Sequence, residues 1–134
     1  MHIDLTLTAN TYQYHVIGIL NKRIVAILID TGASWSHVSK EYCDNIQTLL
    51  KPRTIQRFDG TEKLLSQFSN VLFNIPGMET FQMKIIIDEE PNKVLLGIDF
   101  LENFKYHITS DFLMLNGIRI DRYKLSEEIL RTLI

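Results

Sequence analysis

The sequence predicts an all-β domain with one or two short helices. Most of the chain divides into short runs rich in Val, Ile, Leu, Tyr and Phe, which favour strands. Asn21-Lys22, Asp59-Gly60 and Asn116-Gly117 separate such runs and are typical of tight hairpin turns. At 134 residues the chain is long enough for one compact domain. We expect that domain to cover residues 1–120, with residues 121–134 as a helical tail or the start of a linker.

The N-terminal part reads as a short strand followed by a hairpin. Leu and Thr alternate over residues 5–8, as in a short edge strand. Residues 14–20 and 23–29 are β-rich and lie two residues apart, which predicts a hairpin. The second run is almost wholly apolar and ends at Asp30, so it should be buried on both faces.

The middle of the chain predicts a projecting hairpin. Residues 36–39 suit a short strand, and a helical turn is expected from Lys40 to about Leu49. Residues 54–58 and 61–65 flank Asp59-Gly60 with a polar tip, so this hairpin should stand out from the body.

Strands continue towards the C-terminus. Residues 67–75 and 81–87 are expected strands, and the charged residues 88–90 are expected in a solvated loop rather than a cation site. Residues 94–97 form a buried strand that stops at a glycine, and residues 98–104 have the spacing of a short amphipathic helix. The remaining strands are expected at residues 106–109, 112–115 and 118–120, followed by helical spacing over residues 125–134.

Composition excludes several kinds of function. The formal net charge is -2, so no basic field favours nucleic acid, and no apolar run is long enough to span a bilayer. Cys43 is the only cysteine, which rules out an intrachain disulfide and a cysteine zinc cluster. His2, His15, His37 and His107 lack metal-ligand spacing. We therefore expect no metal or other cofactor, no nucleic acid and no membrane partner.

The strongest candidate site follows the apolar strand that ends at Asp30. A carboxylate placed directly after a buried strand is held rigidly. Gly32 permits close approach of another backbone, and Thr31 offers a hydroxyl for hydrogen bonding. Ala33 and Ser34 are small and leave room for a substrate chain.

Peptide hydrolysis by carboxylates needs two of them, sharing one proton. The chain has one Asp-Thr-Gly triplet and no Asp-Ser-Gly triplet. If Asp30 is catalytic, the second carboxylate must come from another copy of the chain across a two-fold axis.

Two segments resemble a known family. Ile-Leu-Ile-Asp-Thr-Gly-Ala-Ser at residues 27–34 and Val-Leu-Leu-Gly-Ile-Asp-Phe-Leu at residues 94–101 resemble the two signatures of retroviral-type aspartic proteases. The resemblance spans about residues 14–120. Within the family, the sequence is most similar to proteases in polyproteins of plant pararetroviruses of the caulimovirus and badnavirus type, including tungro bacilliform-type viruses.

The resemblance implies a retropepsin-like closed β-barrel or sandwich that forms half of a two-fold dimer, with a flap hairpin. It implies that Asp30 is catalytic, that Thr31 braces the dimer and that Gly32 lies along the substrate. The residues implied to bind substrate, from the active-site loop and the flap, are Ala33, Ser34, Phe58, Asp59, Gly60 and Thr61. The flap has only Gly60, unlike the glycine-rich flaps of many retroviral enzymes.

Peptide binding would occur by strand addition, with side chains alternating into pockets. The expected pocket walls, which imply an apolar preference, are Ala33, Val38, Ile55, Leu96 and Ile98. Asp99 is interpreted as structural, accepting backbone N–H groups at the start of the short helix. Trp35 is interpreted as filling the core or a dimer contact rather than serving as a substrate platform.

Three functions compete. The first is a homodimeric endopeptidase that matures a viral polyprotein in the host cytoplasm or the virus particle. The second is a retropepsin-like dimerisation or binding module of a cellular protein, as in ubiquitin-linked shuttle factors, with little or no proteolysis. The third is a non-enzymatic β-barrel with an accidental Asp-Thr-Gly.

Overall fold

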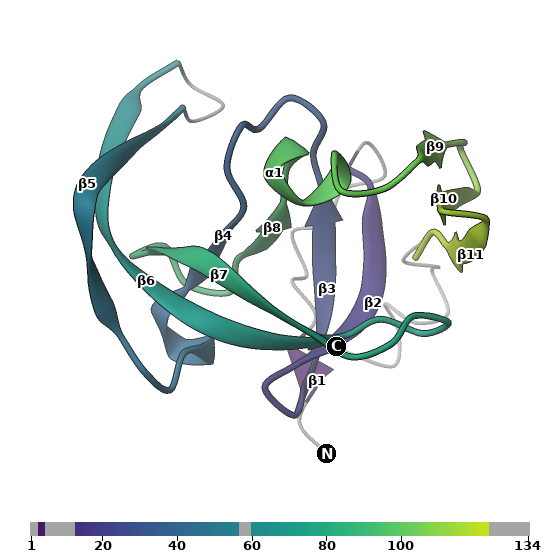
Figure 1. The fold of residues 1–134 in the computed structure, drawn as a ribbon, viewed down its shortest axis with the longest axis horizontal. Coiled ribbons are helices and arrows are strands. Elements are labelled where there is room, and N and C mark those ends of the chain that lie inside the picture. The colour runs from purple at the N-terminus through teal and green to yellow at the C-terminus, as the bar shows by residue number, and fades with distance from the viewer. Residues whose placement is uncertain (1–2, 5–12, 57–59, 124–134) are drawn as a thin grey trace, which may run out of the picture.

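Six strands close into a barrel in the computed structural model, which describes residues 3–4, 13–56 and 60–123 (Figure 1). Around the barrel β3 pairs with β2, β2 with β6, β6 with β7, β7 with β4 and β4 with β8, and β8 returns to β3. The bounds are β1 Ile3–Asp4, β2 His15–Leu20, β3 Arg23–Ile29, β4 His37–Ser39, β5 Gln47–Gln56, β6 Glu62–Asn74, β7 Phe81–Asp88 and β8 Val94–Leu96. The predicted all-β fold with a closed barrel is confirmed.

The first predicted hairpin is confirmed. Asn21 and Lys22 both adopt positive φ angles, 45° and 71°, which match the twist of the paired strands β2 and β3. β3 buries most of its length in the core, as its apolar sequence predicts. β1 pairs in parallel with the start of β3, and the predicted strand at residues 5–8 lies outside the described residues.

A row of aromatic rings connects the sheet to the short helix α1 (Ile98–Leu101). Phe73 stacks on Phe81 with 5.2 Å between ring centroids, and Phe81 stacks on Phe100 at 5.5 Å. Phe100 in turn contacts Phe104 at 5.1 Å. These contacts fix α1 against β6 and β7, so the helix has a defined position despite its length.

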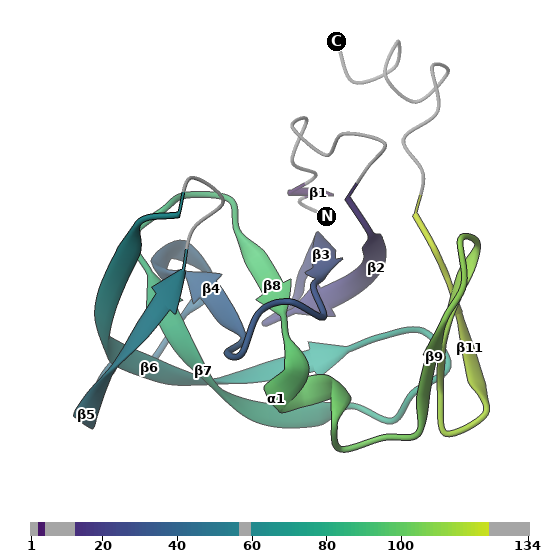
Figure 2. The same ribbon diagram turned by 90° about the horizontal axis from the view of Figure 1, so that it is seen from above.

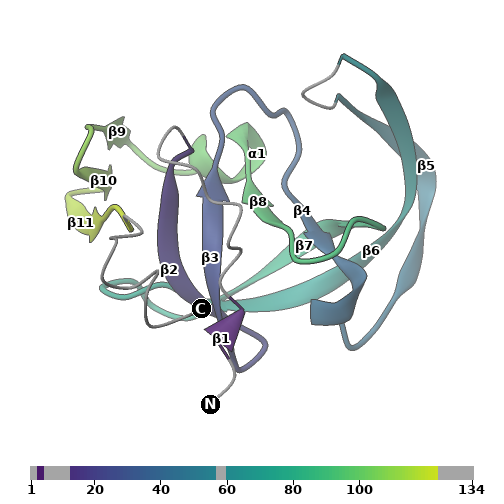
Figure 3. The same cartoon turned by 180° about the vertical axis from the view of Figure 1, so that it is seen from behind.

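A long hairpin formed by β5 and the first half of β6 projects from the barrel, on the left in Figure 1 and the right in Figure 3. The predicted hairpin is therefore present, and Phe58 and Asp59 at its tip lie outside the described residues. The helical turn predicted from Lys40 to Leu49 is wrong beyond a 3-10 turn at Lys40–Tyr42. β5 begins at Gln47 because pairing with β6 satisfies its backbone groups.

The short helix predicted at residues 98–104 ends early, at Leu101. The side-chain amide of Asn103 donates to the carbonyls of Asp99 and Phe100, which satisfies groups that a longer helix would use. A second sheet of three strands follows beside the barrel: β9 Tyr106–Ile108, β10 Phe112–Leu115 and β11 Ile118–Asp121 (Figure 2). Asn116 and Gly117 form the predicted turn, with φ angles of 50° and 83°.

β11 runs to Asp121, and Tyr123 bridges to His15 on β2, which ties the second sheet to the barrel. The helical spacing over residues 125–134 lies outside the described residues. Within the described part of the chain, no helix has the length and apolarity needed to cross a membrane.

The alternation of burial along β6 gives a stability prediction. Phe73 is 0% exposed, whereas its neighbour Leu72 is 45% exposed. Phe73→Ala should lower the free energy of unfolding by about 3–5 kcal/mol, because it removes a fully buried ring and leaves a cavity. Leu72→Ala should change it by no more than about 0.5 kcal/mol. Urea unfolding monitored by circular dichroism measures both, and equal losses would contradict the assigned strand register.

Candidate active site

The candidate site lies where the barrel closes. β3 and β8 run in parallel, with Leu28 opposite Leu95 and Ile29 opposite Leu96. The Asp30 N–H continues this ladder by donating to the Leu96 carbonyl at 3.0 Å. The two apolar strands therefore deliver both sequence signatures to one end of the barrel.

The turn after β3 is held by its own hydrogen bonds. The Ala33 N–H donates to the Asp30 carbonyl at 3.2 Å, and the Gly32 N–H donates to Asp30 Oδ1 at 2.9 Å. Asp30 is half-buried, while Thr31, Gly32 and Ser34 are exposed. The loop therefore presents its carboxylate and backbone at the surface of the single chain.

Gly97 and Gly32 differ in what a side chain would meet at each position. A Cβ on Gly97 would lie 2.5 Å from the carbonyl oxygen of Ala33, so only glycine permits this contact. The contact lets the Ile98 N–H donate to the same carbonyl at 2.9 Å. A Cβ on Gly32 would meet only Asp30 Oδ1, at 3.3 Å. Gly32 therefore leaves an open face beside the carboxylate.

Asp99 braces the loop that follows β3 (residues 30–36, the candidate active-site loop). Its carboxylate accepts from the Ser36 N–H at 2.9 and 3.0 Å, from Ser36 Oγ at 2.6 Å and from the Phe100 N–H at 2.9 Å. Ser36 Oγ also accepts from the Gly97 N–H at 2.9 Å. The structural interpretation of Asp99 is confirmed, and its main partner is the loop after β3 rather than its own helix.

A cavity of about 280 Å³ lies between the active-site loop and the projecting hairpin. Its lining comes from the loop, from β4 and from both arms of the hairpin: Gly32, Ala33, Ser34, Trp35, His37, Thr54, Ile55, Gln56 and Glu62. Two of the predicted walls, Ala33 and Ile55, line it. The other predicted walls do not: Val38 and Leu96 are completely buried in the core, and Ile98 packs against that core.

Trp35 has two environments. Its ring packs against the small cluster of Ile55, Leu65 and Ile86, and the Arg53 guanidinium lies 4.1 Å above the ring centroid. Trp35 also contributes to the cavity wall. Trp35 therefore packs on a core cluster, as predicted, and also faces the cavity, which the prediction did not include. At the hairpin end, Gly60 and Thr61 are exposed and lie outside the cavity lining.

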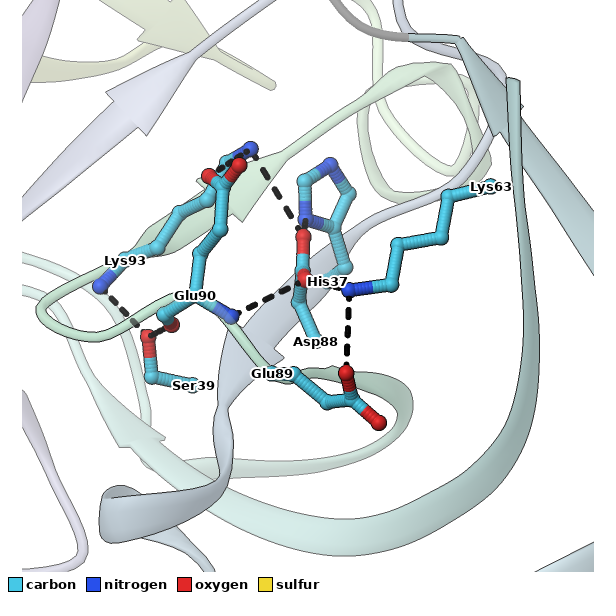
Figure 4. A network of polar contacts seen from close by, with 7 residues as sticks. All are labelled: His37, Ser39, Lys63, Asp88, Glu89, Glu90 and Lys93. Atoms are coloured by element: carbon cyan, nitrogen blue, oxygen red, sulfur yellow. Dashed lines mark hydrogen bonds and ion pairs between the residues drawn. The ribbon is translucent and has the colours of Figure 1, made fainter. Parts of the chain in front are cut away.

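The prediction of a solvated loop at residues 88–90 is wrong for Asp88, which is 0% exposed at the end of β7 (Figure 4). Its carboxylate lies 3.4 Å from His37 Nδ1 and 3.7 Å from the ammonium groups of Lys63 and Lys93. Glu89 pairs with Lys63 at 3.3 Å. The sequence signal that could have predicted this burial was the apolar run before Asp88, the same pattern that precedes Asp30.

The Asp88 carboxylate is held ionised by this network. Burial by itself raises the pKa of Asp88, but the adjacent His37 imidazole, the hydrogen bond from the Glu90 N–H and the Lys93 charge outweigh it. The pKa of Asp88 therefore lies well below its ordinary range. Ser39 completes the surroundings by accepting from the Lys93 N–H at 2.6 Å and donating to the Glu90 carbonyl.

Comparisons with known proteins agree with this geometry. Residues 16–103 match the family described as "gag-polyprotein putative aspartyl protease". "Uncharacterized protein 7" of Soybean chlorotic mottle virus is 46% identical over 127 residues, covering 94% of this chain and 86% of that protein. The chain belongs to the gag-type aspartyl protease family. The predicted resemblance to retropepsin-like proteases of plant pararetroviruses is confirmed.

Two solved structures share the fold of this family member. The retroviral protease-like domain of Ddi1 from Leishmania major superposes with a TM-score of 0.58 at 17% identity, covering 86% of this chain and 97% of that one. The EIAV protease in complex with the inhibitor HBY-793 superposes with a TM-score of 0.52 at 17% identity, covering 73% and 92%. A protease role in general follows from the family and the fold together.

The brace between the loop and α1 gives the next prediction. Ser36→Ala should lower the free energy of unfolding by about 1–3 kcal/mol, because the buried Gly97 N–H and the Asp99 carboxylate each lose a partner. Ser34→Ala, an exposed serine in the same loop, should change it by about 0.5 kcal/mol or less. Chemical denaturation compares the two, and no difference between them would show that the brace contributes nothing.

The low pKa of Asp88 predicts loss of stability in acid. The unfolded carboxyl titrates near pH 3.9 and the folded one lower, so the unfolded chain takes up the proton first. The stabilisation is complete above that pH and is lost as the pH falls below about 4. Urea titrations from neutral to strongly acidic pH should show a shallower pH dependence for Asp88→Asn. Glu79→Gln, an exposed carboxyl-to-amide control, should keep the native dependence.

Proposed function

We propose that this protein is an aspartic endopeptidase that works as a homodimer, with one Asp30 from each chain at its centre. The observation that carries the proposal is the position of the single Asp-Thr-Gly triplet. It lies at the surface end of a buried strand, with Thr31 and Gly32 exposed around the half-buried carboxylate. A second copy facing this loop across a two-fold axis would supply the second carboxylate and cover the exposed residues.

The chemistry follows from two carboxylates that share one proton. One Asp30, ionised, takes a proton from a water molecule as that water attacks the carbonyl of the peptide bond. The other Asp30, protonated, donates to the carbonyl oxygen. The Gly32 N–H bonded to Asp30 Oδ1 and the Ala33 N–H bonded to the Asp30 carbonyl would hold each carboxylate in orientation.

The substrate would be an extended peptide lying between the active-site loop and the hairpin of β5 and β6. Strand addition to the hairpin would provide backbone hydrogen bonds, and the cavity beside Ala33 and Ser34 would accept a side chain. The hairpin end would act as a flap that closes over the peptide and excludes water. The flap residues proposed to approach the peptide are Phe58, Asp59, Gly60 and Thr61.

The natural substrate would be a viral polyprotein. The similarity to a protein of Soybean chlorotic mottle virus and the match to a gag-polyprotein protease family support this assignment. The enzyme would then act in the host cytoplasm or the virus particle. Residues 1–120 would form the protease domain, with residues 121–134 as a tail or the start of a linker.

The central prediction concerns Asp30. Asp30→Asn should lower kcat/KM for a polyprotein fragment by at least about a thousand-fold, because an amide cannot act as general base. Asp121→Asn is the matched control, since that carboxylate is 79% exposed and pairs with Arg119 on the surface of the second sheet. It should keep native activity. Cleavage is measured by mass spectrometry of the products, with circular dichroism confirming that both variants fold.

The same assay tests the dimer. If two chains form one site, the rate should rise faster than linearly with protein concentration below the dimer dissociation constant. Native cleavage by Asp30→Asn would refute the proposed catalytic role. Dimers without cleavage by either protein would instead assign the chain to the binding modules.

A further inference from the structure

One wall of the cavity beside the active-site loop is formed by a buried histidine. His37 lies on β4, where it is opposite Ile86 on β7 and Leu95 on β8, so its backbone is fixed on both sides. Its side chain is 5% exposed, yet it contributes to the cavity lining. We propose that His37 is a specificity-determining residue, which selects a neutral hydrogen-bonding side chain, that of Asn, Gln, Ser or Thr, in the bound peptide. This inference rests on the proposed peptide-binding function.

The orientation of the His37 ring is set by Asp88, which lies against one of its two nitrogens. His37 Nδ1 lies 3.4 Å from Asp88 Oδ2, and the other ring nitrogen points away from Asp88 (Figure 4). Asp88 is in turn held by Lys63 and Lys93, each at 3.7 Å, and by the Glu90 N–H at 3.1 Å. The buried carboxylate therefore engages one side of the imidazole and leaves Nε2 for the cavity.

The other ring nitrogen, Nε2, can either accept or donate a hydrogen bond. In a neutral ring whose Nδ1 proton faces Asp88, Nε2 is an acceptor, and in a protonated ring it is a donor. Carboxamide and hydroxyl side chains carry both a donor and an acceptor, so they pair with His37 in both states. An aliphatic side chain would cover this nitrogen without a partner, which costs binding free energy.

The rest of the lining fits a side chain with an apolar stem and a polar end. Ser34, Thr54, Gln56 and the Glu62 carboxylate add further hydrogen-bonding groups around the cavity. Ala33 and Ile55 provide apolar surface for the methylene groups of the bound side chain. The apolar preference expected from the sequence assumed that Val38 and Leu96 face the substrate, and both are buried in the core.

The test separates recognition from catalysis by using the Asp30→Asn chain, which keeps the cavity. A random heptapeptide library displayed on phage is selected against three proteins: Asp30→Asn alone, and the same chain carrying His37→Val or His37→Gln. With His37 present, one peptide position should be enriched in Asn, Gln, Ser and Thr. Synthetic peptides differing only as Thr against Val, or Asn against Leu, at that position should differ in Kd by about 5-fold.

The variants distinguish a specificity role from a structural one. His37→Val should reverse the preference towards Val and Leu, whereas His37→Gln, which keeps a polar group, should retain it. His107→Val, which replaces an exposed histidine on β9, should leave the selection unchanged. Enrichment of aliphatic residues with native His37, an identical profile for His37→Val, or no enrichment at any position would each overturn the proposal.

The outcome is independent of the cleavage assay. A polar preference that depends on His37, found together with absence of cleavage by the native chain, would support the pocket assignment and refute the proposed protease activity. Cleavage by the native chain without a His37-dependent preference would do the reverse.

Discussion

The parallel pairing of β3 with β8 is the constraint on which the rest of the structure depends. It closes the barrel and brings two segments from opposite ends of the domain to one place. The pairing alone would leave the loop after β3 loosely held, because only its first residues share the ladder. The hydrogen bonds from Ser36 to Asp99 and from Gly97 to Ser36 extend the connection beyond the strand ladder, to the loop after β3 and the start of α1. Hydrogen bonds to a carboxylate are stronger than neutral ones, which suits this position.

The barrel places two carboxylates in similar sequence settings and opposite physical ones. Asp30 and Asp88 each follow an apolar strand. Asp30 emerges at the open end and makes one short bond to its own loop. Asp88 ends inside, where burial would disfavour its charge without the surrounding cations. The groups that other elements place around each carboxylate, rather than its local sequence, decide which one reaches solvent and which supports the wall of the cavity.

The sequence was a good guide where local chemistry decides the structure. Two-residue turns such as Asn21-Lys22 can be predicted from their spacing between β-rich runs and from residues such as Asn that tolerate positive φ. β3 can be predicted from its unbroken apolar run. The sequence was a poor guide where contacts between residues far apart in the chain decide the structure. Residues 47–49 form a strand only because β6 lies alongside. Val38 and Leu96 face the core because of their register, and Asp88 is buried because Lys63 and Lys93 approach from other elements.

The brace between Ser36 and Asp99 has a consequence for when the Asp-Thr-Gly loop becomes ordered during synthesis. The two residues are 63 positions apart, and four of the six barrel strands, β4, β6, β7 and β8, lie between them in the chain. A nascent chain that ends before β8 contains the complete Asp-Thr-Gly triplet but lacks β8, Gly97 and the Asp99 carboxylate. Long-range contacts of this kind form late, because the intervening chain must be ordered first. The Asp-Thr-Gly triplet is therefore synthesised well before the scaffold that holds it, and its loop reaches its final geometry only when the domain is whole.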